Sequence, residues 1–114
     1  MSDKLERQDK EIKRIKRLLK QVDKDRLATM QSLIKNAAFM SVTLDDLQDA
    51  MNQNGVISEY QNGENQWGTK KSPEVEIYNT MIKNHMAIMK QLIDLLPETS
   101  SHDKKDLLLE FLKK

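Results

Sequence analysis

The stretch Tyr60-Gln-Asn-Gly-Glu-Asn-Gln-Trp67, followed by Gly-Thr-Lys-Lys and by Ser72-Pro73-Glu74, divides this 114-residue chain into two helical parts. Asn62-Gly63 is a strong hairpin signal, because a type I′ turn requires positive φ at both central residues. Pairing outward from that turn sets Ser58 against Trp67 and Tyr60 against Asn65. Tyr60 and Trp67 would then pack as diagonal neighbours. We therefore predict one small β-hairpin between two helical blocks.

A long helix is predicted directly after the hairpin, from Pro73 to about Leu96. Ser72 is a suitable N-cap, and Pro73 fits the first helical position, where a missing N–H costs nothing. The apolar stripe of this helix is too broad for one short partner helix, so we expect one side to face the same chain and another to face a neighbouring subunit. A central helix in a monomeric bundle is the alternative. The predicted oligomerisation residues are Val75, Tyr78, Ile82, His85, Met89, Leu92 and Leu96.

The N-terminal part predicts another long helix, from about Asp3 to Ala38. Four apolar residues follow 3-4-3 spacing, which is typical of a coiled-coil seam: Ile12, Ile15, Leu19 and Val22. The stripe changes phase near residues 23–26 and resumes at Leu27. A helix of this length would be about 50 Å long, so we expect it to bend at the phase change and also to pair with another helix.

The outward positions of this heptad pattern are mainly positively charged. Residues 1–26 contain ten Lys/Arg against six Asp/Glu, although the whole chain has a net charge of only +1. The acidic residues Asp9, Glu11, Asp23 and Asp25 flank the seam instead. A solvated coiled-coil face is one interpretation, and contact with nucleic-acid phosphates is the other. The predicted DNA-binding residues are Arg7, Lys10, Lys13, Arg14, Arg17, Lys20 and Lys24.

A short second helix is predicted from Leu44 to Asn54. Thr43 would cap it, and Gly55 would end it. Three aspartates lie near its start: Asp45, Asp46 and Asp49. Their spacing fits no calcium loop, so we interpret them as favourable charges at the positive end of the helix dipole, with no metal bound.

The last segment, residues 99–114, begins with capping residues and ends in an apolar turn. Leu107, Leu108, Phe111 and Leu112 share one face. A helix this short is marginal alone, so it must dock on its own core, a sister subunit or another protein, and the sequence does not decide which.

Several classes of function lack their usual signals. The chain has no cysteine, so it has neither disulfides nor thiolate metal sites. It contains no apolar run long enough for a membrane span and no signal-peptide pattern, which predicts a soluble protein that is not exported. A phosphate-binding glycine loop and catalytic residue sets are also missing. We therefore expect no enzyme activity and no cofactor, and we interpret His85 as a core or interface residue.

The run from Gly55 to Thr99 resembles the C-terminal half of the small subunit of tailed-bacteriophage terminases. The similarity rests on the entry Gly55-Val56-Ile57, the hairpin around Asn62-Gly63, the Ser-Pro-x-Val helix start, Asn79 and Met81, and the ending Leu95-Leu96-Pro97. It implies a ring-like homo-oligomer in the host cytoplasm that binds double-stranded viral DNA. The oligomer would regulate a separate large subunit that carries the ATPase and nuclease.

The N-terminal half departs from that family, in which many members have a compact helix-turn-helix. A long basic helix and an acidic second helix favour phosphate contacts over base reading. We thus predict a mainly α, oligomeric protein: a basic helix in residues 1–40, a helix, hairpin and oligomerisation helix in 41–98, and a tail helix in 99–114. The alternative function is a coiled-coil assembly or adaptor module without a nucleic-acid role.

Overall fold

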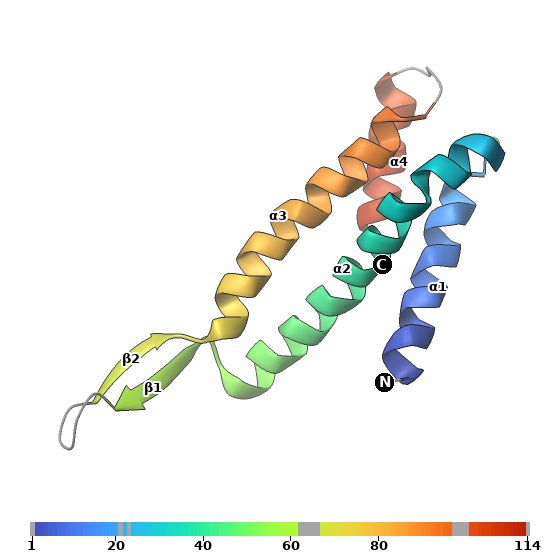
Figure 1. Ribbon diagram of the computed structural model, residues 1–114. Helices are drawn as coiled ribbons and strands as arrows, with labels where there is room; N and C mark the ends of the chain where they lie inside the picture. The colour runs from blue at the N-terminus through green and yellow to red at the C-terminus, as the bar shows by residue number, and fades with distance from the viewer. Residues whose placement is uncertain (1, 21, 23, 62–66, 97–100, 114) are drawn as a thin grey trace.

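The computed structural model describes residues 2–20, 22, 24–61, 67–96 and 101–113. It confirms the mainly helical fold. Four helices and two strands follow one another along the chain (Figure 1). Their bounds are α1 Ser2–Leu18, α2 Lys24–Asn54, β1 Ile57–Gln61, β2 Trp67–Lys71, α3 Pro73–Asp94 and α4 Ser101–Leu112.

The predicted helix over residues 3–38 is wrong, because α1 ends at Leu18 and α2 begins at Lys24. Two backbone hydrogen bonds lie between the helices: Leu19 N donates to Ile15 O at 3.1 Å, four residues back, and Val22 N donates to Leu19 O at 2.9 Å, only three residues back. Leu19 and Val22 are both buried as the chain turns. The phase change in the apolar stripe therefore marks a reversal between two helices, which lets both apolar faces reach one core.

The predicted break at residues 41–43 is also wrong, because α2 runs without interruption from Lys24 to Asn54. Ala38, Ser41 and Val42 lie on its buried face. Ser41 Oγ donates to Glu11 of α1 at 2.6 Å, which ties this part of α2 to α1. Burial of a continuous face thus outweighs the local capping signal at Thr43, which lies inside the helix.

Gly55 ends α2 as predicted. Its φ of 81° is in the left-handed region, and its N–H donates to Met51 O at 2.8 Å, which satisfies a carbonyl of the last turn. Ser72 occupies the N-cap position of α3, but its hydroxyl makes no capping bond and donates to Gly55 O at 3.2 Å. Gly55 and Ser72 thus join the two ends of the segment that contains both strands.

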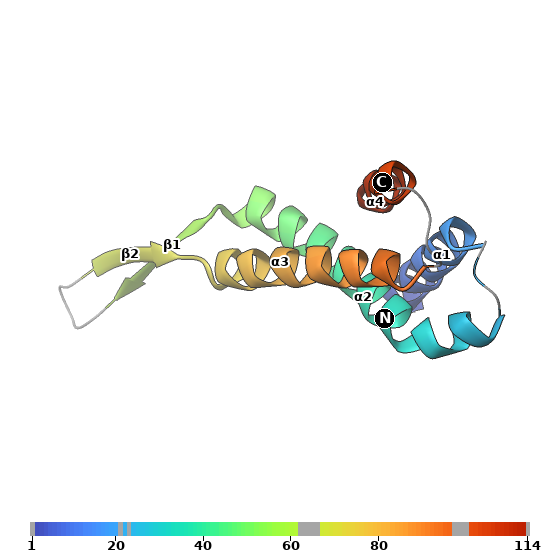
Figure 2. The same ribbon diagram turned by 90° about the horizontal axis from the view of Figure 1, so that it is seen from above.

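β1 and β2 pair in antiparallel fashion, with Ser58 opposite Lys70 and Tyr60 opposite Gly68. The predicted pairings of Ser58 with Trp67 and of Tyr60 with Asn65 are therefore wrong. The contact predicted between Tyr60 and Trp67 depended on that register and loses its basis. The Asn62-Gly63 turn lies outside the described residues. Seen from two directions, this two-stranded ribbon extends beyond the ends of α2 and α3 (Figures 1 and 2).

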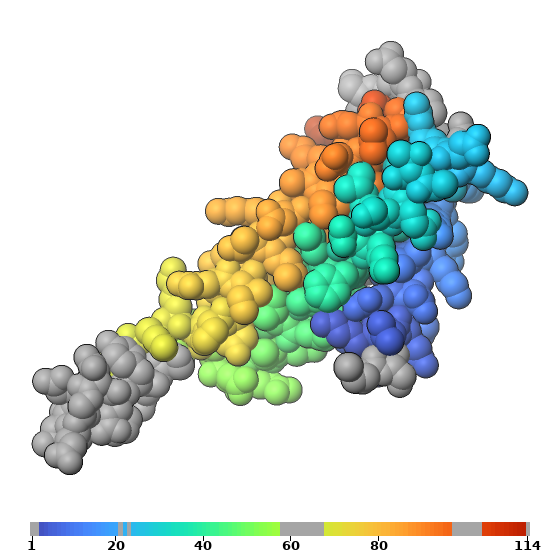
Figure 3. All heavy atoms as spheres, in the orientation of Figure 1, coloured from blue at the N-terminus to red at the C-terminus, as the bar shows by residue number. Residues whose placement is uncertain are grey.

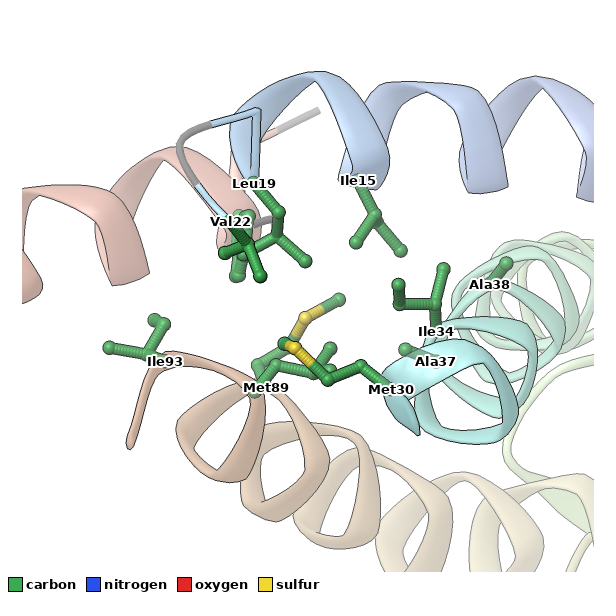
Figure 4. Close-up of a cluster of buried hydrophobic side chains, with 11 residues drawn as sticks. Ile15, Leu19, Val22, Met30, Ile34, Ala37, Ala38, Met89 and Ile93 are labelled. Carbon is green, nitrogen blue, oxygen red and sulfur yellow. The ribbon is translucent and has the colours of Figure 1, made fainter. Parts of the chain in front are cut away.

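The core lies where the four helices meet. Ile15 of α1 and Leu19 in the turn after it are fully buried with Met30 and Ile34 of α2, Met89 and Leu92 of α3, and Phe111 of α4. Figure 4 shows the side chains of α1, α2 and α3 pointing toward one another. The seam thus packs on other helices, as predicted, and these helices belong to the same chain. The α4 helix likewise docks on its own core through Phe111.

The molecule is elongated, with principal extents of 63 × 33 × 21 Å (Figure 3). We call residues 47–82 the arm: the end of α2, both strands and the start of α3. Ser72 is the only buried residue among those of the arm whose side chains the structure describes. The described side chains of the arm consequently form no core of their own.

Candidate nucleic-acid interface

Four of the seven predicted DNA-binding residues form an exposed cationic row, which we define as Lys10, Lys13, Arg17 and Lys20. Lys10, Lys13 and Arg17 follow each other at three- and four-residue spacing on α1, so they lie on one side of the helix. Lys20 continues the row in the turn after Leu18. Lys24 is exposed as well, but it begins α2 and does not belong to the same helix.

Arg7 is held in a different environment from the row. Its Nη1 donates to Asp46 Oδ1 of α2 at 2.7 Å, and Lys4 Nζ lies 3.7 Å from the other oxygen of that carboxylate. The hydrogen bond to Asp46 raises the pKa of Arg7 above its ordinary value. Lys4 Nζ also lies 5.2 Å from the centre of the Phe39 ring. These contacts attach the start of α1 to the middle of α2.

Arg14 connects α1 to the end of α4. Its Nε donates to Glu11 Oε1 at 2.5 Å, Nη2 donates to Phe111 O at 2.8 Å, and Nη1 donates to Glu110 O at 3.1 Å. The carbonyls at a helix C-terminus lack intrahelical donors, and Arg14 supplies them. Its placement in the outward set is therefore corrected, because its guanidinium points to α4.

Glu11 is the residue of this face whose surroundings the heptad pattern did not predict. It is only 8 % exposed, and it accepts hydrogen bonds from Ser41 and from Arg14. The three-residue spacing of Glu11 and Arg14 indicates the local pair. Ser41 is distant in the sequence, so no local pattern could have identified it as the third member.

A groove of about 360 Å³ runs along the inner side of this face. Its lining includes Arg7, Lys10, Arg14 and Arg17, but also Glu11, Val42 and Asp45. The two acidic residues would repel a phosphate placed inside the groove. Phosphate contacts are therefore expected on the exposed side chains of the row, of which Lys13 and Lys20 do not belong to the lining of this groove.

The predicted oligomerisation residues divide into two groups along α3. His85, Met89 and Leu92 are buried in the core of the same chain, and Leu96 packs against that core. Val75 and Tyr78 are half-buried in the arm, where Gln48 Nε2 donates to Tyr78 Oη at 3.0 Å. Ile82 is 41 % exposed.

Two apolar grooves flank the start of α3. One, of about 410 Å³, is lined by Met40, Glu76, Ile77, Thr80, Met81 and Asn84. The other, of about 270 Å³, includes Leu44, Tyr78, Ile82, Met86 and Leu112. Because Ile77 and Ile82 are five residues apart, they lie on different faces of the helix. We call these the Ile77 groove and the Ile82 groove.

Within the described residues, no group of three or more His, Asp or Glu side chains is arranged to hold a metal ion. Asp46 instead accepts from Arg7, as described above.

No helix in the described part of the chain combines the length and apolarity needed to cross a membrane.

Comparisons with protein-family models, with curated proteins and with solved structures find no match to this chain.

Proposed function

We propose that this chain is the small subunit of a phage DNA-packaging terminase. It would bind double-stranded viral DNA as an oligomer and regulate a separate large subunit that carries the ATPase and nuclease. The observation that carries the proposal is the combination of an exposed cationic row at one end of the molecule with an unpartnered arm at the other. The resemblance of residues 55–99 to terminase small subunits supports the same function.

The cationic row supports binding to phosphates. Lys10, Lys13, Arg17 and Lys20 form no ion pair with any described residue, although acidic side chains are common in this chain. Each phosphate contact releases condensed counterions, and this release provides most of the sequence-independent affinity for DNA. Because phosphates position a protein without identifying bases, binding should depend only weakly on DNA sequence.

The arm supports assembly. An exposed apolar face usually indicates an interaction site, and here two different faces of α3 are apolar. If the Ile77 face of one subunit contacts the Ile82 face of the next, the interface is heterologous, and such interfaces generate rings when the rotation closes. The two-stranded ribbon adds unpaired strand edges that a neighbouring subunit can cover.

The test compares two quadruple charge reversals with equal change in net charge. In the first, Lys10, Lys13, Arg17 and Lys20 become Glu; in the control, the exposed residues Lys35, Lys83, Lys90 and Lys105 become Glu. Arg14 is left intact, because it holds α4. Both variants should keep near-normal melting temperatures, since exposed charges contribute little to stability. Only the first should lose DNA binding in electrophoretic shift titrations at two salt concentrations.

For the wild-type chain, log K should fall linearly with log salt at about 0.9 per phosphate contact. Equal loss of binding in both variants would show that net charge matters and the row does not. Normal binding by the row variant would move the DNA site elsewhere. If the unmodified chain binds no DNA at all, the adaptor function is favoured.

A further inference from the structure

We infer that α4 is a latch on the cationic face, and that α4 and a polyanion compete for Arg14. The inference deepens the proposed function, because it concerns regulation of the same DNA-binding face. It rests on the contacts of Arg14, on the way α4 is anchored, and on the position of Arg14 beside the row.

Arg14 makes contacts that a bound phosphate would replace. Two of its nitrogens donate to the Glu110 and Phe111 carbonyls, and its side chain is only 24 % exposed. A hydrogen bond from guanidinium to phosphate is charged on both sides and is stronger than one to a neutral carbonyl. Arg14 therefore has a favourable alternative partner whenever phosphate comes close.

The position of Arg14 brings phosphate close. Lys10 and Arg17 are its neighbours at four- and three-residue spacing on α1, and Lys13 directly precedes it in the sequence, so a DNA backbone on the row passes beside it. In the latched state Arg14 does not contribute to the row, because its guanidinium donates to the carbonyls at the end of α4.

The attachment of α4 is limited. Phe111 is the only buried side chain among residues 104–113, whereas Leu109 is 59 % exposed and Leu112 is 36 % exposed. A helix of 12 residues is marginal without tertiary contacts. Loss of the Arg14 bonds would remove the side-chain donor of the Phe111 carbonyl and leave the Glu110 carbonyl with the Lys113 N–H at 3.3 Å, so the transfer of Arg14 to phosphate should loosen the whole helix.

The first experiment measures amide hydrogen exchange in the unmodified full chain, alone, with a DNA duplex, and with inorganic polyphosphate. Residues 104–113 should exchange about fivefold faster or more with either polyanion, since by linkage a ligand that prefers the released state raises its population. Amides of residues 30–42 should be unaffected. Equal or slower exchange of α4 in both complexes would overturn the latch.

The second experiment uses the salt dependence of DNA binding. Phe111→Ala should release α4 and add one phosphate contact, which steepens the slope of log K against log salt by about 0.9. Phe111→Leu, a smaller change, serves the same purpose if the alanine variant does not fold. Leu109→Ala is the matched control on the exposed side of α4 and should behave as wild type. Adding Arg14→Gln to the Phe111 variant should remove the extra slope.

These outcomes separate the latch from the proposed function. DNA binding with an unchanged slope in the Phe111 variants overturns the latch and leaves the DNA-binding function standing. Loosening of α4 by polyphosphate in a chain that binds no DNA supports the latch and overturns the proposed function. If neither polyanion binds or alters α4 exchange, both are wrong.

Discussion

Glu11 connects three helices through one carboxylate. It belongs to α1, accepts from Ser41 of α2 at 2.6 Å, and orients Arg14, which in turn reaches the last turn of α4. A buried carboxylate requires such partners, because removing an ionised group from water is costly unless hydrogen bonds replace the lost hydration. The network therefore sets how α1 lies against α2 and where α4 ends.

At this scale we predict that Ser41→Ala lowers the free energy of unfolding by about 1.5–3 kcal/mol, the usual range for a hydrogen bond to a charged group. Urea denaturation measures the change. Ser32→Ala, at an exposed position of the same helix, is the control and should change stability by less than about 0.5 kcal/mol. If both variants behave alike, the hydroxyl of Ser41 has no special role in holding Glu11.

Among the elements, α2 is the one whose limits have contrasting causes. Its interior passes through Ser41 and Thr43 without a break, because the buried face that includes Ala37, Ala38 and Leu44 is continuous. The end of α2, in contrast, is set by a single residue, because Gly55 adopts a φ of 81° that residues with a side chain rarely tolerate. A Cβ at this position would meet only Ile57 O, at 4.0 Å, so the restriction is conformational and not steric crowding.

We accordingly predict that Gly55→Ala destabilises the protein by about 1–2 kcal/mol, which is the cost of the left-handed conformation for a residue with a Cβ. Gly55→Asn should cost less, because asparagine visits this conformation more readily. Chemical denaturation of the two variants provides the comparison. Equal stability of the alanine variant and the wild type would contradict a strict requirement for glycine here.

As a whole, the molecule is more extended than a compact chain of its length. Its radius of gyration is 18.2 Å, whereas a compact chain of this size would have about 13 Å. The excess comes from the arm, whose exposed apolar residues include Val56, Ile57, Ile77 and Ile82. An arm without a core is expected to gain stability from contacts with other subunits.

The oligomeric state provides the test at this scale. Met89 is fully buried, so Met89→Glu places an unpaired charge in the core and should abolish cooperative unfolding. Ile77→Glu and Ile82→Glu change exposed positions, so they should keep the helical circular dichroism and reduce the mass measured by light scattering. Gln91→Glu, at an exposed site outside both grooves, is the control. A wild-type chain that is already monomeric at micromolar concentration would contradict the assembly proposal.

Local chemistry was sufficient to predict where α2 ends and where α3 begins, because Gly55 and the pair Ser72-Pro73 restrict the backbone themselves. The phase change after Val22 likewise indicated an irregularity in the first helix. Tertiary contacts decided the rest. A hydrophobic stripe shows that a helix must be buried but not which surface buries it, so the sequence predicted a partner helix for the α1 seam but could not show that α2, α3 and α4 of the same chain provide it. The burial of Glu11 and the capping role of Arg14 depend on Ser41 and Phe111, which only the folded chain brings to them.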